Sequence, residues 1–185
     1  RMNHQVIPGT AALVDQCRSH GFEIIYARIA CLTEDGRDRS LSQKKPGFNY
    51  LLLPKDREDS QLVPELTPQG DEIVITKTTD SALTGSNLRL ILHNIGIRNV
   101  VVAGIFTDQC VSSTVRSLAD ESFNTLIVED CCAASTMAAI LGKNTDFLPG
   151  GFATSPCVNI HWSGLVGALL IFSGSASKVK LFSSE

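Results

Sequence analysis

Two side chains in this 185-residue chain have types and positions suited to covalent chemistry, Cys110 and Lys77. Cys110 follows the apolar run 99–104, which is typical of a strand buried on both faces, and stands where the helix-compatible residues 110–120 begin. The first turn of a helix stabilises a thiolate, which is the nucleophilic form of cysteine. Cys110 is therefore a candidate nucleophile, and the alternative is a buried cysteine that acts as a small apolar side chain.

Lys77 follows a second apolar segment, residues 72–76, at the position where a parallel strand would reach its carboxyl edge. If this strand and the strand at 99–104 are neighbours joined by one helix, Lys77 and Cys110 meet at the same edge of the sheet. A nearby ammonium group stabilises a thiolate and can stabilise an oxyanion or assist proton transfer. The alternative is an exposed charge at a strand end.

The elements expected around these residues alternate between helix and strand. Gly21 and Gly96 each follow a helical stretch, where glycine commonly ends a helix. The expected helices are 10–20, 85–95 and 110–120, and the expected strands are 23–29, 72–76, 99–104 and 125–128. This order predicts a mostly parallel sheet with right-handed crossovers and helices on both faces. The charged segment 33–69 is expected to be a loop, either over the site or as a solvated excursion.

Composition narrows the class of protein. Hydrophobic residues make up 43%, charged residues 19%, and the formal net charge is -3, which fits one globular domain and gives no basic footprint for nucleic acid. The apolar run 165–172 is too short to span a bilayer, so no membrane partner is expected. Six cysteines at irregular spacing without a CxxC pair, and no cleavable signal, predict reduced thiols and a cytoplasmic protein. Cys131 and Cys132 are interpreted as small residues at a strand end, and the alternative for this adjacent pair is redox chemistry or metal binding.

Three motifs carry a resemblance to a known family. KTTDSALTGSNL (77–88), GIRNVVVAGIFTDQCV (96–111) and LIVEDCCAAS (126–135) resemble, in order and spacing, the isochorismatase-like cysteine hydrolases, with weaker similarity back to Val6. The resemblance implies a three-layer αβα, Rossmann-like fold with a six-stranded parallel sheet. It also implies a small-molecule substrate and a homo-oligomer, a dimer or tetramer.

The resemblance further implies a catalytic triad of aspartate, lysine and cysteine, with Lys77 and Cys110 at the matching positions. The thiolate would attack an amide or ureido carbon and pass through a covalent acyl-enzyme that water hydrolyses. An oxyanion hole would involve a non-proline cis bond between Ile105 and Phe106 together with the backbone of Cys110. Residues at the same turn, Phe106, Thr107 and Gln109, would bind the substrate.

The subgroup is indicated by LTEDGRDRS (32–40), KKPGFN (44–49) and TDQCVSSTVR (107–116). These segments look closest to the enzymes that hydrolyse biuret, ureidoacrylate and similar small carbamoyl amides. No cofactor is expected. No metal is expected either, because the four histidines are not paired at ligand spacing.

Two departures from the family pattern accompany the resemblance. The aspartate belongs to a first, central strand, and no residue before Val6 fits it. We therefore expect a single domain over 1–185 that is truncated at its N-terminus, lacks that strand and leaves sheet surface uncovered. Residues 139–185 diverge from the family, and the apolar run within them is either a substitute strand or a tail. The alternative to an active hydrolase is a catalytically defective relative that acts as a binding or scaffold protein.

Overall fold

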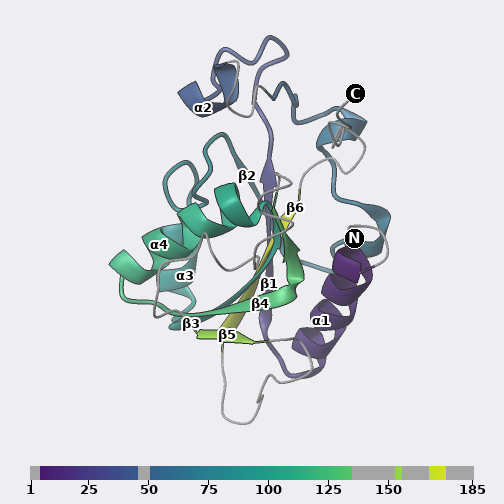
Figure 1. The fold of residues 1–185 in the computed structure, drawn as a ribbon, viewed down its shortest axis with the longest axis vertical. Helices are drawn as coiled ribbons and strands as arrows, with labels where there is room; N and C mark the ends of the chain where they lie inside the picture. The colour runs from purple at the N-terminus through teal and green to yellow at the C-terminus, as the bar shows by residue number, and fades with distance from the viewer. Residues whose placement is uncertain (1–4, 46–50, 135–152, 156–166, 174–185) are drawn as a thin grey trace, which may run out of the picture.

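The computed structural model describes residues 5–45, 51–134, 153–155 and 167–173, and their centre is a parallel sheet (Figure 1). Six strands pair in the order β2-β1-β6-β3-β4-β5, and every pairing is parallel. The strands are β1 (Glu23–Ile29), β2 (Ile73–Lys77), β3 (Asn99–Ile105), β4 (Asn124–Ala133), β5 (Ala153–Ser155) and β6 (Gly167–Ser173). The expected parallel sheet is confirmed.

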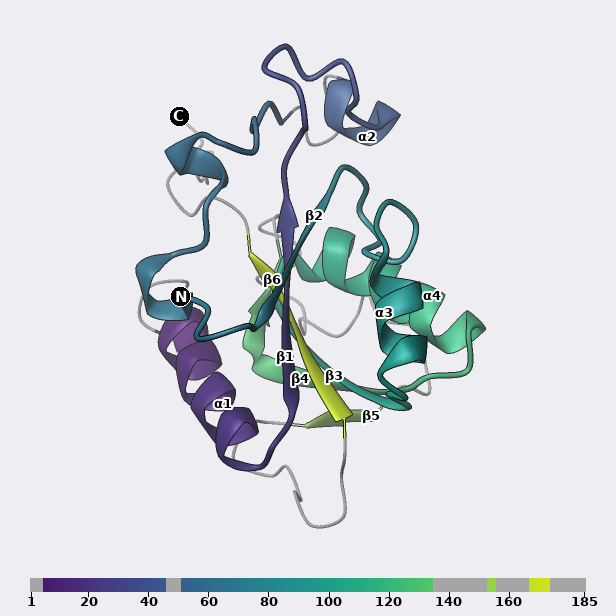
Figure 2. The ribbon, with the colours of Figure 1, turned by 180° about the vertical axis from the view of Figure 1, so that it is seen from behind.

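Helices cover both faces of the sheet. The helix α1 (Ile7–Ser19) lies on one face, and α3 (Leu88–Asn94) and α4 (Ser112–Asp120) lie on the other, as the two opposite views in Figures 1 and 2 show. Two cores follow from this layering. One joins the sheet to α3 and α4 through side chains such as Leu92 and Val115, and the other joins it to α1 through Leu13 and Val14. The three-layer αβα architecture is therefore as predicted.

The centre of the sheet is filled by a strand from the far end of the chain. β6 lies between β1 and β3, with Ile25 opposite Leu170 on one side and Val101 opposite Leu169 on the other. Its apolar residues Leu169, Leu170 and Ile171 are at most 1% exposed. Of the two interpretations of this apolar run, the structure shows the substitute strand. The expected gap in the sheet is not there.

Gly167 lets β6 enter this position. A Cβ atom placed on Gly167 would lie 2.5 Å from the backbone oxygen of Asn99, far inside van der Waals contact. Because Gly167 is opposite Asn99 in the register, a side chain here would push the two strands apart. Glycine is therefore required where β6 begins to pair with β3.

Several boundaries differ from the sequence expectations. The segment 33–69 is not only loop, since it contains α2 (Leu41–Lys44) and the 3-10 turns η2 (Glu58–Ser60) and η3 (Pro64–Leu66). β4 runs to Ala133, well past the expected end. Cys131 and Cys132 are thus buried strand residues, one in the core with α1 and the other in the core with α3 and α4. Within the described ranges, no helix has the length and apolar character that a bilayer crossing requires.

Candidate active site

The structure brings together the two residues that sequence analysis singled out. Lys77 is the last residue of β2, and Cys110 lies in η4 (Thr107–Val111), a π-helical turn that follows β3. The Lys77 Nζ donates a hydrogen bond to Cys110 Sγ at 3.1 Å. Lys77 is 1% exposed and Cys110 6% exposed, so this ammonium–sulfur contact is almost shielded from water.

The path between the two residues differs from the expectation. β2 and β3 are not neighbours, because β1 and β6 lie between them. Strands in a sheet are about 4.8 Å apart, so the ends of β2 and β3 are separated by about 14 Å. The long Lys77 side chain and the turn that carries Cys110 bridge this distance. Their contact therefore lies beyond the carboxyl ends of β1 and β6, the two strands between β2 and β3. Open parallel sheets bind ligands at this edge.

The ammonium group of Lys77 is held in place by the chain that follows it. Lys77 Nζ also donates to the backbone oxygen of Thr79 at 2.9 Å. The next residues are fastened to α4, since the N–H of Ala82 donates to Thr114 Oγ1 at 2.9 Å and the hydroxyls of Ser81 and Ser117 lie 2.9 Å apart. The helix that follows Cys110 thus also positions the segment that holds Lys77.

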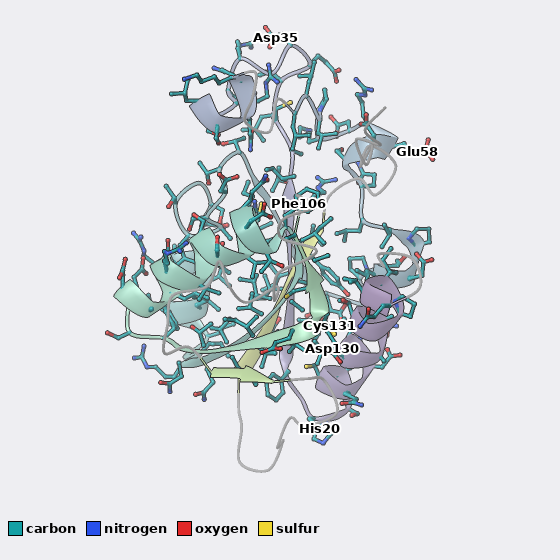
Figure 3. All side chains as sticks on the ribbon, in the orientation of Figure 1. His20, Asp35, Glu58, Phe106, Asp130 and Cys131 are labelled. Carbon is teal, nitrogen blue, oxygen red and sulfur yellow. The ribbon has the colours of Figure 1, made fainter. Side chains whose placement is uncertain are left out.

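The turn that carries Cys110 is built around the backbone oxygen of Phe106. This oxygen accepts the N–H groups of Gln109 and Val111, both at 3.1 Å. The peptide bond between Ile105 and Phe106 is cis, as expected. Phe106 is partly buried against the small core of Val6, Ile105 and Ala133, and Figure 3 labels it just beyond the end of β3.

Thr107, the first residue of this turn, has a buried hydroxyl group without a hydrogen-bond partner in the described part of the chain. The residue is 1% exposed, yet its Oγ1 has no hydrogen-bond partner among the residues that the structure describes. A buried hydroxyl without a partner is costly. The Thr107 hydroxyl is thus unsatisfied within the described structure, while Gln109, the other polar residue predicted to bind substrate, is half-buried.

One buried polar residue of the segment after β1 was not predicted from the sequence. Gln43, in α2, is 2% exposed, and its Nε2 has no hydrogen-bond partner in the described part of the chain. No local signal marks it, because it stands in a charged stretch that reads as solvated surface. Its burial depends on tertiary contacts of the segment after β1.

Cys31 lies two residues beyond the end of β1, but its thiol is not suited to act as a nucleophile. Burial raises the pKa of its thiol, and the nearby Asp38 carboxylate raises it further. The Asp38 carboxylate accepts hydrogen bonds from the N–H groups of Leu32 at 2.7 Å and Thr33 at 3.2 Å. Burial alone would raise the pKa of Asp38, but these hydrogen bonds outweigh burial, so the pKa of Asp38 is lowered. Cys31 therefore stays protonated beside a charged carboxylate.

No three or more His, Cys, Asp or Glu side chains gather into a metal-holding group within the residues described. The site consists instead of a thiol, an ammonium group and backbone amides.

Comparison with known families identifies the family and the fold of the chain. The model of the isochorismatase domain matches residues 3–140, which include β1 to β4 and both Lys77 and Cys110. The chain belongs to the isochorismatase family. The expectation drawn from the three sequence motifs is thus confirmed.

Curated relatives match parts of the chain. Ureidoacrylate amidohydrolase RutB of Pseudomonas syringae is 45% identical over 74 residues, 40% of this chain and 30% of that protein. The protein of the same name from Klebsiella pneumoniae is 39% identical over 110 residues, 57% of this chain and 47% of that protein. The uncharacterized isochorismatase family protein YrdC of Bacillus subtilis is 28% identical over 137 residues, 74% and 65% of the two chains. The chain thus spans between 30% and 65% of the length of these relatives.

Solved structures agree on the fold. An isochorismatase family protein from Burkholderia thailandensis superposes with a TM-score of 0.73 at 25% identity, over 84% of this chain and 80% of that one. N-carbamoylsarcosine amidase from Thermoplasma acidophilum gives a TM-score of 0.70 at 21% identity, over 85% of each chain. At such identities the likeness concerns the arrangement of the elements.

Proposed function

We propose that this isochorismatase-family protein is a cysteine hydrolase that cleaves a C–N bond of a small amide, carbamoyl or ureido substrate. The observation that carries the proposal is the buried contact of 3.1 Å between Lys77 Nζ and Cys110 Sγ. A positive charge held against a thiol favours its thiolate form, and a thiolate is the species that attacks a carbonyl carbon.

The reaction would proceed in two steps. The Cys110 thiolate attacks the carbonyl carbon, and backbone N–H groups of the Phe106–Cys110 turn stabilise the resulting oxyanion. The C–N bond then breaks as the Lys77 ammonium gives a proton to the departing nitrogen, which leaves an acyl group on sulfur. In the second step, water attacks this acyl group while the Lys77 amine accepts its proton, and the Cys110 thiolate is released.

The names of the relatives support the substrate class. Two of the proteins that this chain resembles are called ureidoacrylate amidohydrolases, and a structural neighbour is called an N-carbamoylsarcosine amidase. The unpartnered Thr107 hydroxyl supports the same class, because amide and ureido groups offer both donors and acceptors to such a group. We place Phe106, Thr107 and Gln109 around the substrate.

Ammonia release from a panel of small ureido and carbamoyl compounds tests this function. We expect wild-type protein to release ammonia from at least one compound and Cys110→Ala to release none above background. Cys132→Ala is a matched control, because it removes another buried thiol from the same core. Equal activity of wild type and Cys110→Ala would rule out the nucleophile assignment.

A second candidate is a defective relative that binds such compounds without cleaving them. The observation that favours it is the central strand β6, whose sequence GALLIFS has no acidic residue, although the family resemblance implies an aspartate on a central strand. Saturable binding by calorimetry without any ammonia release across the panel would identify this case. Release of ammonia that depends on Cys110 would exclude it.

A further inference from the structure

The connection from β2 to α3, residues 78–87, contains no helix or strand, yet hydrogen bonds within it fix its path. The hydroxyl of Thr79 donates to the backbone oxygen of Ser81 at 2.7 Å, and the hydroxyl of Ser86 donates to the oxygen of Ala82 at 2.6 Å. Side chains of serine and threonine commonly stabilise turns in this way. The connection is therefore a set of ordered turns, and it lies beside α4 in both Figures 1 and 2.

Thr79 holds the active-site lysine through its backbone and the connection through its side chain. Its oxygen accepts a hydrogen bond from Lys77 Nζ at 2.9 Å, and the same Nζ donates to Cys110 Sγ at 3.1 Å. The peptide group that carries this oxygen lies between Thr79 Oγ1 and the Ser81 oxygen, the two atoms joined by the hydroxyl hydrogen bond. That hydrogen bond therefore fixes the direction in which the Thr79 oxygen points.

Gly85 leaves the space that the Thr79 side chain occupies. A Cβ atom placed on Gly85 would lie 2.5 Å from Thr79 Oγ1 and 3.0 Å from Thr79 Cγ2. Gly85 is itself exposed, so burial of this position does not explain why it has no side chain. The close approach of Thr79 does explain it, because any side chain at Gly85 would displace the threonine.

The far side of the connection is fastened to the helix that follows the thiol. The N–H of Ala82 donates to Thr114 Oγ1 at 2.9 Å, and Thr114 is 0% exposed. Thr114 lies four residues after Cys110, in the helix α4 that continues directly from η4. The group that holds Lys77 and the turn that carries Cys110 thus share one support.

We propose that Thr79 is a positioning residue, whose side chain, seated against Gly85, directs the backbone oxygen that keeps Lys77 Nζ against Cys110 Sγ. A lysine side chain has many rotamers, and holding it in one of them costs entropy. A well-directed acceptor therefore increases the time that the ammonium group spends beside the thiol. The use of this pair in catalysis rests on the proposed function, whereas the geometry that Thr79 sets is present without substrate.

Alkylation of Cys110 by iodoacetamide at pH 7 tests the role of Thr79 without any turnover. We expect Thr79→Ala to slow alkylation by about threefold to tenfold, the loss typical of one hydrogen bond between uncharged groups. Thr79→Ser keeps the hydroxyl that bonds the Ser81 oxygen and should restore most of the rate. Gly85→Ala should slow alkylation as well, because its methyl group displaces Thr79. Thr84→Ala is the matched control, since it makes the same exchange at an exposed residue of the same connection and should leave the rate unchanged.

The Lys77→Met background separates positioning from a general loosening of the site. With no ammonium group to direct, Thr79→Ala should have no further effect on the alkylation rate there. An equal effect of Thr79→Ala with and without Lys77 would overturn the proposal, as would unchanged rates in both Thr79→Ala and Gly85→Ala. Gly85→Ala changes an exposed residue and tests the same point if Thr79→Ala does not fold. A failure of the proposed function is distinct, because it shows as absence of ammonia release from wild-type protein.

Discussion

At the scale of single residues, the account depends on a lysine that the fold buries. An ammonium group is stable at 1% exposure only when partners replace its water, and two of these partners are the oxygen of Thr79 and the sulfur of Cys110. Lys77 and Cys110 are therefore expected to act as one unit.

Lys77→Met tests this coupling, because it keeps the length of the side chain and removes its charge. We expect alkylation of Cys110 by iodoacetamide at pH 7 to slow by about tenfold or more, the order of effect that one close charge has on an ionising group. The rate is measured by mass spectrometry of the peptide that contains Cys110. Lys55→Met, at a half-exposed lysine, should leave the rate unchanged, and an unchanged rate in Lys77→Met would argue against the coupling.

At the scale of elements, the pairing of β6 with β3 depends on a close approach of their backbones at Gly167 and Asn99. Gly167→Ala places a methyl group 2.5 Å from the Asn99 oxygen, so the backbones of the two paired strands would have to shift apart. We expect the free energy of unfolding to fall by about 1–3 kcal/mol, as for an overpacked core, measured by chemical denaturation.

Gly9→Ala is the control for this change. Its new methyl group would meet Cys131 Sγ at 3.5 Å, an ordinary contact, and alanine favours the helix. Stability should therefore stay equal or rise. If Gly167→Ala also left stability unchanged, the close pairing of β6 with β3 would be wrong.

The ion pair between Arg18 in α1 and Glu72, the residue before β2, gives a prediction about pH. Arg18 donates to Glu72 at 2.7 and 2.9 Å, and the Gln69 N–H donates to the same carboxylate at 2.8 Å. Burial alone would raise the pKa of Glu72, but these hydrogen bonds outweigh it, and the pKa is lowered. The charged carboxylate therefore stabilises the fold above its unfolded pKa of about 4.3.

Glu72→Gln removes this contribution. We expect a loss of about 1.5–3 kcal/mol in the free energy of unfolding at pH 7. The difference from wild type should shrink as the pH falls below about 4, because the unfolded wild-type chain then binds a proton at Glu72 more readily than the folded protein, in which the pKa of Glu72 is lowered. Urea denaturation at pH 7 and pH 3.5 measures both values, and a difference that persists unchanged in acid would contradict the assignment.

At the scale of the whole molecule, local sequence predicted the elements well and their neighbours less well. β1 has the predicted bounds, and Gly21 and Gly96 follow α1 and α3 with φ of 72° and 73°, because these signals reside in adjacent residues. The insertion of β6 between β1 and β3 could not be predicted. A strand buried on both faces is apolar throughout, so its sequence says nothing about which strands flank it.

The polar residues of this part of the molecule also divide into those that the sequence marks and those that it does not. The contact between Cys110 and Lys77 was predicted because both residues follow apolar strand segments, which the sequence marks. Gln43 was missed because its burial arises from the path of a long segment between β1 and β2. The burial of such a polar residue depends on tertiary contacts, which the local sequence does not mark.

The central claim is that Cys110 carries an acyl group during the reaction. Intact-protein mass spectrometry of samples quenched in acid within the first turnover of a cleaved compound measures this directly. The account predicts an added mass equal to the acyl fragment of the substrate, located on the peptide that contains Cys110 and absent from Cys110→Ala. Turnover without any adduct on Cys110, and with undiminished ammonia release from Cys110→Ala, would contradict it.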